Sequence, residues 1–396
     1  MSMVETSVPL APSAIDRSAD LDRLRSRLVG LGRPPTAQDV AEAMRAEGRP
    51  VSDRALIETL EELRRGSVGA GPLEPLLREP GVTDVLVNGP DQVYVDRGRG
   101  LEPRPVRFGT DEEVRRLAQR LAASVGRRLD DGSPFVDARL ADGTRVHAVL
   151  AGVAAPGTCL SLRVPARTSF SLADCVESGS LTAAGAEVLR RIVASRLAYL
   201  ISGGTGSGKT TLLAALLGLV PANERIVVVE DSRELAPNHP HLVRMEGRPA
   251  NTEGAGAITL TDLVRHSLRM RPDRLVVGEV RGAEIADLLA AMNTGHEGGC
   301  GTVHANSAAD VPARLEALAA LGGMARQALH AQVASALHAV VHISRRDGGP
   351  RRVEGISVLD RDPVGGLVST VPALIFGPDG RTRIGPGGER LERLLG

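Results

Sequence analysis

The chain has 396 residues, of which 42% are apolar and 24% charged, and its 48 basic residues balance its 48 acidic ones. At about 100 to 200 residues per domain, this length predicts two to four domains. The composition is that of a soluble globular protein, which excludes a disordered chain or a small disulfide-stapled module. Zero net charge and 2% aromatic residues also argue against holding nucleic acid by bulk charge or base stacking, so no direct nucleic-acid partner is expected.

Neither disulfides nor membrane spans are predicted. Cys159, Cys175 and Cys300 are widely separated and form no CxxC pair, which argues against a disulfide framework and a zinc ribbon. No stretch approaches the about 18 apolar residues that a membrane span needs, and the N-terminus has no signal-peptide core. We expect a cytoplasmic protein.

The N-terminal half divides into a helical segment and a small α/β domain. Residues 1–66 show amphipathic helical patterns over 15–29, 36–46 and 52–65, separated by Gly and Pro. Residues 67–165 are predicted to form the α/β domain. Its expected strands and single helix cover residues 83–87, 92–95, 135–140 and 144–150 for the strands and 111–125 for the helix. A linker is expected over residues 166–176.

Residues 177–396 alternate helices with apolar strands and carry a C-terminal extension. The expected helices and strands cover residues 182–196, 197–202, 209–217, 226–230, 275–280 and 339–344, followed by a short terminal helix. The strands over 226–230 and 275–280 are almost continuously apolar, as are strands buried on both faces. This alternation predicts an α/β domain with a parallel, doubly wound sheet.

A phosphate-binding loop follows the strand over 197–202. The pattern GxxxxGK[ST] is matched by Gly203, Gly204, Thr205, Gly206, Ser207, Gly208, Lys209 and Thr210. Glycines let the backbone N–H groups face phosphates, Lys209 can reach the β and γ oxygens, and the Thr210 hydroxyl can bind Mg²⁺. A glycine-rich helix entry with an incidental lysine is the alternative. It is disfavoured because Lys209 is the only lysine of the chain.

Acidic residues stand at the ends of two downstream strands. Glu230 and Asp231 close one apolar run, and Glu279 lies near the end of another. Parallel strands of such folds bind ligands at their carboxyl ends, so these acids can activate water or hold magnesium through water. The alternative is that they only cap the strand ends.

The segment over residues 295–307 places His296, Cys300 and His304 at intervals of four. On a helix this spacing would suggest zinc, but three glycines make a helix improbable there. A loop that brings an imidazole near the γ-phosphate is the favoured interpretation. Histidines that merely satisfy backbone groups are the alternative.

These motifs together resemble the secretion ATPases of type II and type IV systems. The matching segments are Walker A (203–211), an Asp box (227–235), Walker B (271–282) and a His box (295–307). Within that superfamily the chain is similar to the tight-adherence pilus ATPases called TadA or CpaF, a VirB11-like branch. That similarity rests on residues 71–98 and 133–150.

The resemblance implies a RecA-like P-loop ATPase domain that binds ATP and Mg²⁺ and works in a homohexameric ring. By position, Glu279 would be the catalytic Walker B glutamate. The remaining implied site residues are Gly203 to Thr211 around the nucleotide, with Thr210 on magnesium, Glu230 and Asp231 of the Asp box, and His296 and His304 of the His box. Arg139, Arg145 and Arg163 resemble N-domain arginines that approach the γ-phosphate.

The sequence therefore predicts an ATPase that drives pilin export or pilus assembly. It would act at the cytoplasmic face of the inner membrane, peripherally bound to a membrane platform protein. A conjugation or type IV secretion ATPase that serves DNA or effector transfer is a second interpretation. A nucleotide-dependent switch without turnover is a third, disfavoured because Glu230 and Glu279 are both present.

Overall fold

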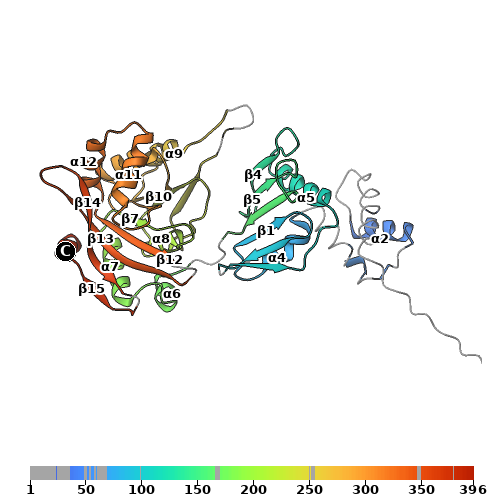
Figure 1. Ribbon diagram of the computed structural model, residues 1–396, viewed down its shortest axis with the longest axis horizontal. Coiled ribbons are helices and arrows are strands. Elements are labelled where there is room, and N and C mark those ends of the chain that lie inside the picture. The colour runs from blue at the N-terminus through green and yellow to red at the C-terminus, as the bar shows by residue number, and fades with distance from the viewer. Residues whose placement is uncertain are drawn as a thin grey trace, which may run out of the picture. The chain divides into compact units, whose positions relative to one another are not determined.

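The protein comprises two compact units, Met1–Pro165 and Ala166–Gly396 (Figure 1). The computed structural model describes Leu24 and residues 36–48, 51–52, 55–57, 59, 69–98, 100–165, 170–248, 250, 255–345, 349–377 and 379–396. Each unit has its own apolar core. Within the described ranges, no helix combines the length and the hydropathy that crossing a bilayer requires.

The helix predicted over residues 36–46 is confirmed as α2 (Ala37–Ala46). Its start is fixed by a capping box, in which the Asp39 backbone N–H donates to the Thr36 hydroxyl and the Asp39 carboxylate accepts from the Thr36 N–H. The helix expected over 15–29 lies outside the described residues apart from Leu24, and so does most of the one over 52–65.

The N-terminal unit is built on a six-stranded antiparallel sheet with the order β3-β2-β1-β6-β5-β4. Its strands are β1 (Asp84–Asn88), β2 (Val93–Asp96), β3 (Leu101–Arg104), β4 (Phe135–Arg139), β5 (Arg145–Val149) and β6 (Cys159–Arg163). Side chains alternate between a buried and an open face, as the pleat dictates. Helices α4 (Glu74–Arg78) and α5 (Asp111–Ala123), with the short η1 (Gly71–Leu73), pack on the buried face.

Four of these strands and α5 match the sequence prediction, whereas β3 and β6 were not predicted. The sequence LEPR of β3 contains a proline and no apolar alternation. In β6 only Leu160 and Leu162 face the core, which is too short a pattern to stand out. Pairing with β1 and β5 on either side makes β6 a central strand.

The C-terminal unit contains a nine-stranded sheet with the order β15-β14-β13-β12-β7-β11-β10-β8-β9. Its strands are β7 (Tyr199–Ser202), β8 (Ile226–Glu230), β9 (Leu242–Glu246), β10 (Arg274–Val280), β11 (Cys300–Val303), β12 (Ala339–Arg345), β13 (Arg351–Arg361), β14 (Val368–Phe376) and β15 (Thr382–Ile384). The strands from β12 to β9 in this order are parallel, which confirms the predicted parallel sheet. Two of them, β9 and β11, were not predicted, and β11 lies within the segment expected to be a loop. The antiparallel extension β13 to β15 was not predicted.

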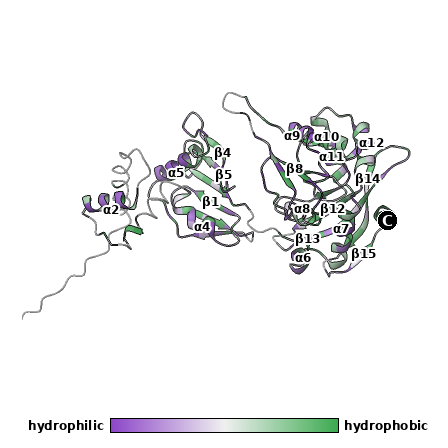
Figure 2. Ribbon diagram, turned by 180° about the vertical axis from the view of Figure 1, so that it is seen from behind, coloured by the Kyte–Doolittle hydropathy of each residue, from purple (hydrophilic) through white to green (hydrophobic). Residues whose placement is uncertain are grey.

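Helices cover both faces of this sheet (Figure 1). One face is covered by α6 (Leu172–Glu177), α7 (Ala183–Ala194), α8 (Lys209–Leu217) and α13 (Gly388–Leu395). The other is covered by α9 (Leu260–Ser267), α10 (Glu284–Asn293), α11 (Val311–Leu321) and α12 (Arg326–Ala336), with η2 (Leu268–Met270) after α9. The buried strand β8 is apolar over its first four residues (Figure 2), as a strand enclosed on both faces must be.

The range 166–176, expected to be a linker, contains most of α6. The Ser171 side chain caps this helix, and Leu172 and Cys175 pack into the core of the C-terminal unit. Residues 172–176 therefore belong to the folded C-terminal unit.

Gly298, just before β11, leaves space for the buried side chain of Arg274, the first residue of β10. Arg274 is 2% exposed, and its Nε donates to Glu224 Oε2 at 2.6 Å. A Cβ atom at Gly298 would come within 1.9 Å of Arg274 Nη1, and φ at Gly298 is +70°. We expect Gly298→Ala to lower the free energy of unfolding by about 1 to 3 kcal/mol, because it displaces a buried ion pair.

The matched control for this substitution is Gly295→Ala. Gly295 also has a positive φ, of +98°, but nothing lies within 4 Å of its Cβ position. Only the backbone strain of about 1 kcal/mol should remain there. Urea unfolding of both variants measures the difference, and equal losses would show that Arg274 tolerates a side chain at Gly298.

Candidate nucleotide-binding site

The predicted strand, loop and helix around residues 197–217 are confirmed. β7 ends at Ser202, α8 begins at Lys209, and β7 lies between β11 and β12 in the sheet. Gly206 and Gly208 have φ of +69° and +101°, the left-handed region that glycine enters at little cost. The loop leads directly into α8, at whose start the free N–H groups of the first helical turn and the helix dipole favour anions.

The start of the loop is packed tightly against the neighbouring strand. A Cβ atom at Gly203 would lie 2.1 Å from the carbonyl oxygen of Ile343 on β12 and 2.7 Å from Ser207 Oγ. The buried Ser207 hydroxyl donates to the Gly204 carbonyl at 2.9 Å. These contacts exclude any side chain at Gly203 and fix the loop before a ligand arrives.

Lys209 is the first residue of α8 and is 7% exposed. Its Nζ donates to the carbonyl oxygens of Gly203 and Gly204, at 3.0 and 2.8 Å. Burial lowers the pKa of Lys209 from its ordinary value, and the negative charge of Glu279 opposes that shift. An ammonium group folded into the loop beside a helix N-terminus suits the β and γ oxygens of a nucleotide. Thr210 and Thr211 follow in the first turn, half-buried.

Glu279, near the end of β10, contacts two basic side chains. Its Oε2 accepts from Arg281 Nη2 at 2.5 Å, and its Oε1 lies 2.5 Å from His304 Nε2. Burial alone would raise the pKa of Glu279, but the Arg281 hydrogen bond and the charges of Arg281 and Lys209 lower it. The carboxylate is therefore ionised at neutral pH and can accept a hydrogen bond from water.

His304 follows β11 at the same edge of the sheet. Burial, and then the positive charge of Lys209, lower the pKa of His304 from its ordinary value of about 6.5. The imidazole is thus neutral at neutral pH. Arg281 also lies 3.7 Å from Asp231 Oδ2, which brings the Asp-box acid to the periphery of the same cluster.

Arg281 was not predicted as a site residue. It lies two positions after Glu279 and bridges Glu279 to Asp231. Among 48 basic residues of which all but one are arginine, no local pattern distinguishes it.

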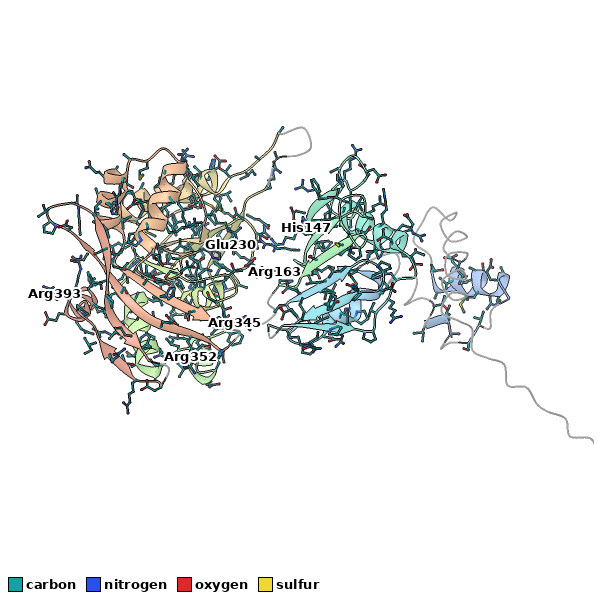
Figure 3. The ribbon with its side chains drawn as sticks, viewed as in Figure 1. His147, Arg163, Glu230, Arg345, Arg352 and Arg393 are labelled. Atoms are coloured by element: carbon teal, nitrogen blue, oxygen red, sulfur yellow. The ribbon has the colours of Figure 1, made fainter. Side chains whose placement is uncertain are left out.

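Glu230, labelled in Figure 3, is more buried than Glu279 and contacts backbone groups where Glu279 contacts an arginine. It is 4% exposed, and its Oε1 accepts from the backbone N–H groups of Glu234 and Leu235, at 2.9 and 2.8 Å. Its buried Oε2 has no hydrogen-bond partner within the described part of the chain, and burial raises the pKa of Glu230. A Cβ atom at Gly278 would lie 2.6 Å from the Glu230 side chain. Glu230 thus holds the segment after β8 against the strand that carries Glu279.

His296 does not join the cluster, contrary to the sequence-based expectation. It follows α10 and precedes β11, whereas His304 follows β11, so the two histidines stand at opposite ends of one strand. His296 Nδ1 lies 3.3 Å from the Ala291 carbonyl oxygen at the end of α10. This is the alternative of a histidine that satisfies a backbone group. Cys300 is buried in β11, so the three residues do not converge on a metal.

Arg139, Arg145 and Arg163 lie side by side in the N-terminal unit. Arg139 pairs with Arg145 between β4 and β5, and Arg145 pairs with Arg163 between β5 and β6. Directly paired residues face the same side of a sheet, here the open one. The row continues to Asp84 of β1, which pairs directly with Arg163, so the three arginines share the open face with an acidic residue.

The donor set fits a magnesium nucleotide. Magnesium is usually held by one or two protein oxygens together with phosphate oxygens and water. Thr210, in the first turn of α8, and the ionised Glu279 supply such oxygens beside the phosphate loop. Lys209 and the loop amides supply the positive surface for the phosphates. Fold and site together define a P-loop nucleotide-binding protein.

The comparisons with known proteins place the chain in one family. Residues 67–352 match the family described as type II/IV secretion system protein, and the chain belongs to that family. A Mycobacterium tuberculosis protein, provisionally named as a conjugal transfer protein, is 55% identical over 315 residues, covering 78% of this chain and 90% of its own length. The type IV secretion system protein PtlH of Bordetella pertussis is 34% identical, covering 73% and 93%.

A solved structure shares the fold. The crystal structure of the pilus retraction motor PilT with bound ADP aligns with a TM-score of 0.51 at 20% identity, covering 74% of this chain and 83% of that one. The predicted fold class, an α/β ATPase-type domain with a smaller sheet domain before it, is thereby confirmed.

Proposed function

We propose that the protein is a Mg²⁺-dependent ATPase. The observation that carries this proposal is an ionised glutamate, Glu279, in the same charge cluster as the phosphate-loop Lys209. Lys209 and the loop amides bind the phosphates, and Glu279 orients a water molecule and accepts its proton as the water attacks the γ-phosphorus. The bond to the ADP oxygen breaks in the same displacement. When bound, magnesium would neutralise phosphate charge, and Thr210 and, through water, Glu279 would hold it.

His304 and Arg281 keep the glutamate in position. His304 is neutral at neutral pH, so its imidazole lies against Glu279 Oε1 without protonating it, although the two groups are not aligned for a hydrogen bond. Arg281 holds the other carboxylate oxygen. We propose that Glu279 rather than Glu230 is the base. Glu230 already accepts hydrogen bonds from two backbone N–H groups of the loop that follows it, so its carboxylate is engaged in holding that loop.

The active form is proposed to be a homohexameric ring in which the arginine row of one N-terminal unit serves a nucleotide site. We expect Arg163→Ala to reduce hydrolysis about tenfold without loss of assembly, because Arg145 and Arg139 remain beside it. Arg116→Ala, on the exposed side of α5, is the control. Full activity of Arg163→Ala would remove that residue from the site.

The biological role is proposed to be pilin export or pilus assembly of the tight-adherence type. The protein would act at the cytoplasmic face of the inner membrane, against a membrane platform protein. The segments 71–98 and 133–150 support this role. A role in conjugation or type IV secretion is the second candidate, favoured by the names of the M. tuberculosis and B. pertussis relatives.

Phosphate release from Mg-ATP tests the proposed activity. Specific activity is expected to rise with protein concentration as rings form, and to vanish on chelation of magnesium. Tight ATP binding without phosphate release at any concentration would instead support the nucleotide-dependent switch.

A further inference from the structure

The hairpin of β12 and β13 lies against the phosphate loop from the side opposite β11. The carbonyl oxygen of Ile343, on β12, packs against Gly203. The Cδ1 atom of the same residue would lie 3.5 Å from a Cβ atom at Gly208. From β13, Arg351 Nε donates to the Gly206 carbonyl oxygen at 3.1 Å. Arg351 Cδ would lie 3.1 Å from the same Cβ position at Gly208. An arginine of the antiparallel extension therefore touches the loop at two of its glycines.

Arg351 has donors left over after this contact. A guanidinium group carries five N–H donors, and Nε supplies the one bound to Gly206. Its Nη atoms have no partner among the residues that the structure describes, and the side chain is exposed. Within the described part of the chain, four N–H donors of this positive group therefore have no partner, beside the loop that is built to hold phosphate.

A second arginine stands directly across from it. Arg345 of β12 pairs with Arg351 in the antiparallel register, and Arg345 Nε donates to the Gly349 carbonyl oxygen. Partial burial, and then the charge of Arg345, lower the pKa of Arg351 from its ordinary value. Like charges opposite each other destabilise a strand pair, and a bound anion would relieve this repulsion.

We propose that Arg351 is a nucleotide-binding residue that donates to a phosphate oxygen of the ligand in the loop. This inference rests on the proposed function and adds the antiparallel extension to the nucleotide site. The guanidinium suits phosphate because it offers parallel N–H donors with a permanent charge. Its anchor on Gly206 positions those donors before the ligand binds.

The test compares the binding of ADP and of inorganic tripolyphosphate to the full chain by calorimetry at two salt concentrations. Arg351→Gln is expected to weaken both ligands about tenfold, the usual worth of a charge-assisted hydrogen bond. The salt dependence of tripolyphosphate binding should also fall, since one charge contact is lost. Arg352→Gln is the matched control, because the next residue of a strand faces the other side of the sheet.

Each outcome decides the proposal. Unchanged affinities in Arg351→Gln would show that Arg351 makes no contact with the ligand and would overturn the proposal. Loss of affinity for ADP alone would place the contact on the nucleoside and would also overturn the phosphate assignment. Arg351→Lys, which keeps the charge, should recover part of the tripolyphosphate affinity. Failure of the unsubstituted chain to bind either ligand would instead refute the proposed function, and this inference with it.

Discussion

Glu279→Gln is expected to lower the rate of ATP hydrolysis by about a hundredfold to ten-thousandfold while nucleotide binding persists. The amide keeps the shape of the carboxylate and can still contact Arg281 and His304, but it cannot accept a proton from water. Single-turnover phosphate release and a separate titration with ATP distinguish chemistry from binding.

The control for this substitution is Glu230→Gln. A glutamine there keeps an oxygen that can accept the N–H groups of Glu234 and Leu235, so the segment after β8 should hold its place. We expect hydrolysis to remain within about tenfold of the unsubstituted rate. If Glu230→Gln abolishes turnover and Glu279→Gln does not, the base is Glu230 and the assignment proposed above is wrong.

Lys209→Ala is expected to weaken Mg-ATP binding about a hundredfold, because the substitution removes the one ammonium group of the chain from the phosphate loop. Lys209→Arg is the sharper variant. A planar guanidinium is wider than an ammonium group, and Nζ sits between two loop carbonyls, at 3.0 and 2.8 Å. Arginine should therefore restore little of the affinity.

The Lys209→Arg variant tests why the chain has a lysine at this one position. Every other basic residue is arginine, so a generic cation at this position would be expected to be arginine too. Titration calorimetry measures both variants against the unsubstituted chain. Full affinity in Lys209→Arg would mean that the loop requires only charge and that its geometry is not selective.

Short sequence patterns predicted those helices, strands and loops whose conformation is determined by residues close together in the chain. The phosphate loop was predictable because its glycines and its lysine occur at a fixed spacing that phosphate binding requires. Strand β8 was predictable because a strand buried on both faces must be an apolar run. The strands β13 to β15 were missed because their burial is irregular, as in β13 with its polar ends. Their place is set by pairing with β12, a contact that no short window of sequence contains.

The candidate site shows the same division. Glu279 and His304 were predicted, and their side chains meet at 2.5 Å, because Glu279 lies near the end of β10 and His304 directly follows β11, two parallel strands that end at one edge. His296 was assigned to the site by its closeness in sequence to His304, but β11 separates the two histidines. Arg281 and Arg351 join the site through side-chain reach and strand pairing, which the sequence does not display.

Calorimetric titration of Mg-ATP into the full chain tests the central claim most directly. The geometry of Lys209, Gly206 and Gly208 predicts saturable heat of binding, competed away by ADP and absent in Lys209→Ala. No heat with any of these ligands, from a chain whose circular dichroism shows it to be folded, would contradict the nucleotide site itself.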